Sequence, residues 1–115
     1  MIDCLVPRPV TSLLVTGVST TDITVRWTIP STGDGNYVTY YSISYTPSCP
    51  ELSSVSVTVP VAPHQSTTTY SFTLRGLYSG MNYTITVRAG NVLGVSSPST
   101  TFQETRPTGI DFINT

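Results

Sequence analysis

Few residues in this chain belong to the types that perform covalent chemistry or hold metals. His64 is the single histidine, and Cys4 and Cys49 are the two cysteines of the 115 residues. General acid–base catalysis needs a titratable group positioned beside a second reactive group, and no Asp, Glu, Cys or Ser is spaced with His64 in a recognisable motif. A structural zinc site needs four ligands, whereas Cys4, Cys49 and His64 together supply at most three. The sequence therefore predicts no catalytic residue, no metal site and no cofactor, and we expect the chain not to be an enzyme.

Asp34 lies in the segment "STGDGN", which superficially resembles part of a calcium-binding loop. Such loops place acidic residues at alternating positions, and this segment has only one acid. We therefore interpret Asp34 as a turn residue between Gly33 and Gly35. His64, in "VAPHQSTT", is interpreted in the same way as a solvated loop residue.

Asn82, Tyr83 and Thr84 form an N-glycosylation sequon. If Tyr83 points into a core from a strand, Asn82 points outward, and its amide is reachable. The alternative is a chance occurrence, because a chain with 21 Thr makes such triplets easily. Asn82 is therefore a candidate glycosylation site that depends on secretion.

The charge and composition of the chain limit its class. Charged residues make up 10% of the chain, the formal net charge is -1, and five Arg with no Lys are scattered along it. Such a surface has no phosphate-neutralising stripe, which argues against nucleic acid as a partner. Thr, Val and Tyr are abundant and favour strands, so the composition indicates an all-β protein. No apolar run is long enough to span a membrane, and Met1 to Pro7 lacks the pattern of a signal peptide.

Period-two alternation between turn residues predicts seven short antiparallel strands and no helix. In the second, "DITVRWTIP", Ile23, Val25 and Trp27 share one face. The expected strands lie at about 12–18, 22–30, 39–47, 54–60, 69–77, 83–90 and 99–105. Residues 31–38 and 90–97 are expected to be loops. This alternation favours a sandwich of short antiparallel strands. Seven strands with Trp27 in the second and Tyr83 opening the sixth resemble the seven-stranded Greek-key β-sandwich of the immunoglobulin-like kind.

Two segments narrow this fold to a family. "PRPVTSLLVTGVSTTDITVRW" has a Pro-rich start and a strand ending in Trp27, and "LRGLYSGMNYTITVRAGNVLGVSSPS" spaces Leu77, Gly80 and Tyr83 around a turn before an alternating strand. Both resemble the fibronectin type III domain. Ser79 stands where that family usually has Pro, the segment between the fourth and fifth strands is long, and the two cysteines are not family features.

The resemblance implies structural roles for Trp27, Leu77 and Tyr83. The Tyr83 ring is expected in the core, with its hydroxyl bonded to a backbone group a few residues upstream. It also places Cys4 and Cys49 near opposite poles, roughly 25 Å apart, so a Cys4–Cys49 disulfide is doubtful. Free thiols or a link to a neighbouring domain are the alternatives. We expect a domain at 9–107, flanked by linkers at 1–8 and 108–115.

The two predicted loops fall at one pole, which is where the family often contacts partners. Val92, Leu93 and Val95 are apolar residues in the second loop, and Tyr37 and Tyr40 lie near the first. They either form a contact site for a protein partner or fold back to cap the end of the sandwich.

The resemblance implies a non-catalytic extracellular module of a cell-surface receptor or adhesion protein. Such a module, monomeric in isolation, acts as a spacer between neighbouring domains or as a protein-binding unit, without inserting into a membrane. The alternative is a linker or accessory binding domain of a secreted carbohydrate-active enzyme.

Overall fold

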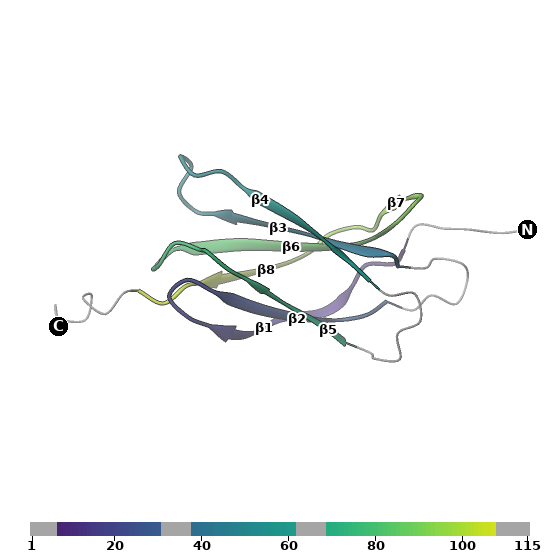
Figure 1. Ribbon diagram of the computed structural model, residues 1–115, viewed down its shortest axis with the longest axis horizontal. Coiled ribbons are helices and arrows are strands. Elements are labelled where there is room, and N and C mark those ends of the chain that lie inside the picture. Colours follow the sequence, from purple (N-terminus) through teal and green to yellow (C-terminus); the bar gives the residue numbers. More distant parts are fainter. Residues whose placement is uncertain (1–6, 31–37, 62–68, 108–115) are drawn as a thin grey trace, which may run out of the picture.

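The computed structural model describes residues 7–30, 38–61 and 69–107. Cys4, Asp34, Tyr37 and His64 lie outside these ranges, as do residues 1–6 of the first expected linker and all of the second, 108–115. Within the described ranges, eight strands run in antiparallel pairs along the long axis (Figure 1). They are β1 (Thr11–Val18), β2 (Ile23–Thr28), β3 (Tyr40–Pro47), β4 (Val55–Pro60), β5 (Thr69–Leu74), β6 (Asn82–Asn91), β7 (Gly94–Val95) and β8 (Ser99–Glu104).

The strands form two sheets that pack face to face. One sheet has the order β1-β2-β5, and the other has the order β4-β3-β6-β7, with β8 pairing β6 on the same side. The chain crosses between the sheets after β2, after β4 and again after β5, so consecutive strands are not all neighbours. This arrangement confirms the predicted all-β sandwich of antiparallel strands.

The strand count differs from the prediction in one place. Residues 90–97 were expected to form a loop, but β6 continues to Asn91 and pairs with the two-residue strand β7. A tight backbone turn closes this hairpin, and its side chains do not alternate over enough residues to produce a strand signal. The remaining seven strands match the predicted segments to within a few residues, as expected for strand boundaries.

Alternation along the strands determines the core. The side chains of Ile23, Val25 and Trp27 on β2 are fully buried, and they face the equally buried Tyr41 and Ile43 on β3. Ile85, Val87 and Ala89 extend the same layer along β6. The Trp27 ring lies 5.0 Å from the Tyr41 ring in an edge arrangement and 5.6 Å from the Tyr70 ring in a stacked one. These aromatic contacts join both sheets at the centre of the molecule.

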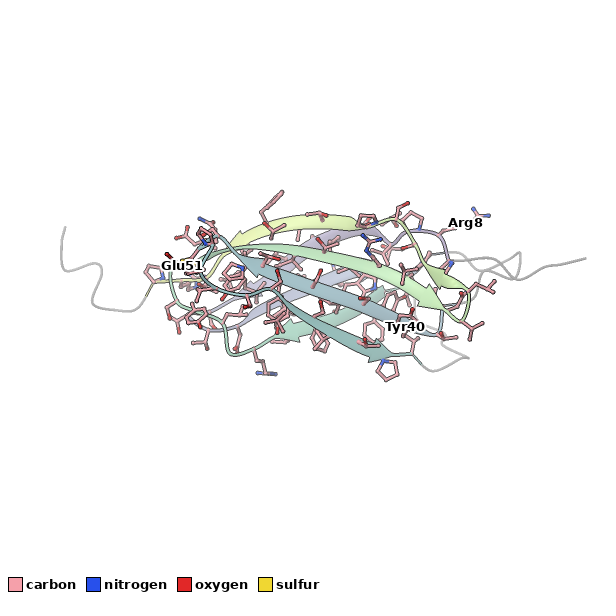
Figure 2. The ribbon with its side chains drawn as sticks, turned by 90° about the horizontal axis from the view of Figure 1, so that it is seen from above. Arg8, Tyr40 and Glu51 are labelled. Atoms are coloured by element: carbon pink, nitrogen blue, oxygen red, sulfur yellow. The ribbon has the colours of Figure 1, made fainter. Side chains whose placement is uncertain are left out.

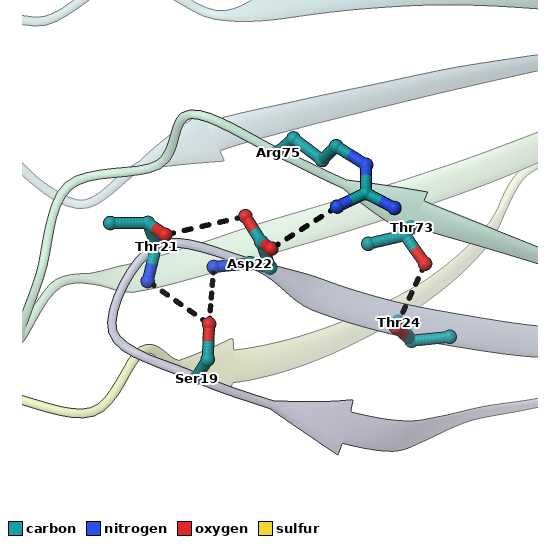
Figure 3. A network of polar contacts seen from close by, with 6 residues as sticks. All are labelled: Ser19, Thr21, Asp22, Thr24, Thr73 and Arg75. Carbon is teal, nitrogen blue, oxygen red and sulfur yellow. Dashed lines mark hydrogen bonds and ion pairs between the residues drawn. The ribbon is translucent and has the colours of Figure 1, made fainter.

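A small polar network organises the turn between β1 and β2 (Figure 3). The Ser19 hydroxyl accepts hydrogen bonds from the backbone N–H groups of Thr21 and Asp22, at 3.2 and 3.0 Å. Asp22 in turn lies 3.4 Å from the Arg75 guanidinium at the end of β5. Arg75 is largely exposed, so this ion pair contributes little stability. The main contribution of the network is the local turn geometry supplied by Ser19.

Candidate functional site

The hairpin of β6 and β7 lies at one pole of the sandwich, beside the start of β3 (Figure 1). Its turn residues are Val92 and Leu93, between the paired residues Asn91 and Gly94. Hairpin turns usually hold Gly, Asn or Asp at the two central positions. Two exposed apolar residues there are therefore unusual, and local propensity does not account for them.

Buried polar groups hold this hairpin in one conformation. The Asn91 side-chain oxygen accepts a hydrogen bond from the Leu93 N–H at 2.8 Å, and Asn91 is only 8% exposed. Ser96, which is also buried, accepts from the Ala89 N–H through its hydroxyl at 3.0 Å and donates its own N–H to the Ala89 carbonyl at 2.8 Å. Because both ends of the turn are fixed, the turn side chains are presented by a preorganised backbone.

The apolar side chains of the hairpin point into solvent. Val92 is 93% exposed, Leu93 52% and Val95 40%. Capping of the sandwich end therefore does not account for the apolar area that these side chains leave exposed. We call these three residues the apolar hairpin tip.

Tyr40 has a packing role within the domain in addition to its predicted place beside the contact site. It begins β3 opposite Gly90 of β6, and its ring lies directly against the Gly90 backbone, where a Cβ atom would collide with the ring. The Thr39 N–H fixes the same place by donating to the Gly90 carbonyl at 2.8 Å. Tyr40 is half-buried at the same end of the molecule as the hairpin, and Figure 2 shows it there, far from Glu51. The ring therefore packs within the domain and borders the candidate site. Tyr37 lies outside the described residues.

Asn82 lies at the opposite pole, where β6 begins. Its side chain is exposed, whereas Tyr83 beside it is 3% exposed. This agrees with the prediction from the sequence that Asn82 points outward when Tyr83 points into the core. The structure therefore separates the glycosylation candidate from the apolar hairpin tip by the length of β6.

The predicted structural residues occupy the core and one corner. Trp27 is fully buried and Leu77 is 6% exposed. The Tyr83 hydroxyl accepts a hydrogen bond from the Tyr78 N–H at 2.9 Å, which is the upstream backbone bond expected from the resemblance. The Leu77 N–H donates to the Thr21 carbonyl at 2.8 Å, so this corner is also tied to the turn between β1 and β2.

One residue of this corner escaped the sequence analysis. Thr105 is 1% exposed, and its hydroxyl donates to the Tyr78 carbonyl at 2.6 Å while accepting from the Met81 N–H at 3.0 Å. It therefore ties the end of β8 to the turn before β6. The sequence offers no signal for it, since a Thr after a strand in a Thr-rich chain has no distinctive spacing.

Cys49 carries a free thiol in the turn between β3 and β4, and it donates to a Glu51 carboxylate oxygen at 3.1 Å. This turn and the start of β1 lie at opposite poles (Figure 1). Within residues 7–30, 38–61 and 69–107, no three His, Cys, Asp or Glu side chains gather as metal ligands would. No helix in the same ranges is long and apolar enough to cross a membrane.

Comparison with known proteins identifies the family. The family model described as "Fibronectin type III domain" matches residues 8–105. The chain belongs to the fibronectin type III family. Domains of this family are generally non-catalytic structural or binding modules, often linked to other domains in one chain.

Solved structures of this family have the same fold. The fn3 domain of the human collagen alpha-1(XX) chain is 22% identical, with a TM-score of 0.72, covering 93% of this chain and 92% of that one. The twitchin kinase region from C. elegans is 21% identical, with a TM-score of 0.69, covering 89% of this chain and 17% of that one. A protein described as a myokine is 19% identical, with a TM-score of 0.68, covering 87% and 98%. No curated protein matches the chain.

Proposed function

We propose that this fibronectin type III domain is a protein-binding module of a cell-surface receptor or adhesion protein, and that it contacts its partner through the apolar hairpin tip. The observation that carries the proposal is the exposure of Val92, Leu93 and Val95 on a rigid two-residue turn. Apolar side chains presented on a fixed backbone lose little conformational entropy on binding, so a large share of their burial energy becomes affinity.

The partner is expected to be a protein with an apolar cleft. No residue from Asn91 to Ser97, the segment that contains the apolar hairpin tip, is charged. The segment therefore offers a partner hydrophobic area and backbone groups rather than ion pairs. The half-buried Tyr40 and the β3 start provide a polar border to this patch. A hydrophobic centre with a polar rim is the usual anatomy of a protein–protein contact.

The extracellular setting is part of the proposal. It is supported by the family context and by the sequon at the exposed Asn82. Neighbouring domains of the same chain are the expected covalent partners, and the isolated domain is expected to be a monomer. Labelling of the natural protein by an antibody at the surface of intact cells, or its recovery from the medium, would support this setting, and its restriction to the cytosol would contradict it.

The binding proposal is tested by screening a tetramerised, biotin-labelled form of the chain against an array of purified extracellular domains. Leu93→Ser should reduce a specific signal by about tenfold or more, as expected when a buried interface anchor is removed. Leu14→Ser is the matched control, because Leu14 is an exposed apolar residue of β1 in the other sheet. Specific binding that survives Leu93→Ser and Val95→Ser together would show that the contact lies elsewhere.

A further inference from the structure

The outer face of β6 and β8 carries the sequon. Asn82 pairs with Glu104, Thr84 with Phe102, and Thr86 with Thr100. These six residues point away from the core, because the intervening Tyr83, Ile85 and Val87 of β6 are buried. Both parts of the sequon that a glycosyltransferase recognises, Asn82 and Thr84, therefore project from the same face of the sheet. Their strand, β6, lies next to β8 (Figure 1).

Phe102 is the one large apolar side chain among these six positions, and it is 70% exposed. The residue directly opposite it is Thr84, and Thr100 and Glu104 flank it along β8. A single exposed phenyl ring is common on protein surfaces and carries no meaning by itself. The position of Phe102 in the strand register is what matters, because it lies directly across from Thr84 of the sequon and diagonal to Asn82.

The diagonal spacing suits a sugar attached to Asn82. Diagonal neighbours on adjacent antiparallel strands lie about 7–8 Å apart, with their Cβ atoms somewhat closer, which is within reach of an aromatic side chain. An N-linked sugar begins beyond the asparagine amide, and its pyranose ring has one face made of C–H bonds that packs on an aromatic ring. The Asn82 backbone is also fixed on both sides, since it pairs with Glu104 and its carbonyl accepts from the Ser48 N–H at 2.9 Å.

We propose that Asn82 is an N-glycan acceptor and that the first sugar of the glycan packs on the Phe102 ring across the β6–β8 pair. The sugar donor is an oligosaccharide linked to a lipid diphosphate. The Asn82 side-chain nitrogen forms a bond to the anomeric carbon, the bond between that carbon and the diphosphate oxygen breaks, and the diphosphate keeps the electron pair while the amide loses one proton.

This inference rests on the extracellular setting proposed above and adds a structural role for the glycan. Packing on Phe102 would cover an exposed apolar ring and would hold the glycan over the β6–β8 face. Because Asn82 and the apolar hairpin tip lie at opposite ends of β6, a glycan held in this way leaves the tip free. The two proposals therefore concern separate surfaces and can fail separately.

The experiment expresses the whole chain behind a signal peptide in a eukaryotic secretory host. Peptide mass analysis after enzymatic deglycosylation in heavy-oxygen water measures how much of Asn82 was occupied. Thr84→Ala, which destroys the sequon and keeps Asn82, is the control for site assignment. The thermal midpoint is then compared before and after deglycosylation, in the wild-type chain and in Phe102→Ser, Phe102→Leu and Leu14→Ser.

Occupied Asn82 is expected, with a glycan-dependent rise in Tm on the order of 4 °C, which is the shift that one added aromatic contact gives a domain of this size. That rise should disappear in Phe102→Ser, shrink in Phe102→Leu and remain in Leu14→Ser. Sugar protons shifted upfield by the ring in NMR spectra of the glycoprotein should also return to normal positions in Phe102→Leu. An unmodified Asn82, or a glycan-dependent rise that is the same in all variants, would overturn the proposal. Neither outcome depends on the hairpin, whose partner binding is measured separately.

Discussion

Two buried tyrosines, Tyr83 and Tyr41, differ in whether their hydroxyl groups have a hydrogen-bond partner. The Tyr83 hydroxyl accepts a hydrogen bond from the Tyr78 N–H. The Tyr41 hydroxyl and the Trp27 indole N–H are both buried, and neither has a hydrogen-bond partner among the described residues. The Trp27 N–H is close enough to Tyr41 to favour its phenolate form, but the two groups are not in hydrogen-bond geometry. The hydroxyl of Tyr83 therefore stabilises the fold, whereas burial of the unpaired Tyr41 hydroxyl destabilises it.

Replacing each tyrosine by Phe separates these effects. Tyr83→Phe keeps the ring and leaves the Tyr78 N–H without its acceptor, so we expect a loss of about 1 kcal/mol in the free energy of unfolding. Tyr41→Phe removes an unpaired buried hydroxyl and should leave stability unchanged or raise it by up to about 1 kcal/mol. Urea denaturation of both variants checks this. Equal losses in the two variants would contradict the difference between their hydroxyl environments.

The Tyr41 hydroxyl also predicts a pH dependence. Burial raises the pKa of Tyr41 above its ordinary value of 10.0, the nearby Trp27 N–H offsets part of this rise, and Tyr70 adds to it. Above pH 10 the unfolded chain therefore loses a proton that the folded chain retains, so folding stability falls as the pH rises from there toward the folded pKa. Tyr41→Phe should make the loss of unfolding free energy between about pH 9 and about pH 11 shallower than in the wild-type chain. Parallel stability curves for the two proteins over this range would rule out the predicted contribution.

At the scale of the element, alternation predicted the strands well, because side-chain burial on one face leaves a period of two. Trp27, Ile43 and Val87 are all buried as their positions in that pattern require. The β6–β7 hairpin was missed because its pairing is made by backbone groups and closed by the buried side chains of Asn91 and Ser96. The sequence also did not determine whether the residues of the apolar hairpin tip are exposed. Apolar residues in a loop are compatible with capping and with contact, and only the backbone path decides between them.

The contact between β3 and β6 at this hairpin is predicted to depend on a glycine. Tyr40 covers Gly90 where a Cβ atom would strike the ring, an aromatic–glycine pairing across strands that stabilises sheets. Gly90→Ala should therefore push the ring away and cost on the order of 1–3 kcal/mol, the range for overpacking.

The same change made in a Tyr40→Ser background should cost much less, because the obstructing ring is absent. A double-mutant cycle measured by urea denaturation gives the coupling between the two residues. Additive losses would mean that the ring does not limit Gly90, and the contact would then have no energetic role.

At the scale of the whole molecule, the core joins sheets that cannot be stable alone. Trp27 and Tyr70 belong to the three-stranded sheet, on β2 and β5, and Tyr41 belongs to β3 of the other sheet. Each sheet buries one face against the other, so separating them would expose the apolar face of both. The Arg106 N–H, just after β8, donates to the Ser19 carbonyl in the turn between β1 and β2 at 2.9 Å, so a backbone bond joins the sheets again at one pole.

This arrangement predicts a single cooperative unfolding transition. Trp27 is the only tryptophan of the chain and is fully buried at the contact between the sheets, so its fluorescence reports on their separation. Circular dichroism reports on the strands themselves, most of which pair residues far apart in sequence. The urea midpoints measured by the two methods should coincide, since strands without the contact between sheets lack a buried face. If the fluorescence transition came at clearly lower urea than the loss of strand signal, one sheet would persist alone, and the proposed mutual dependence of the two sheets would be wrong.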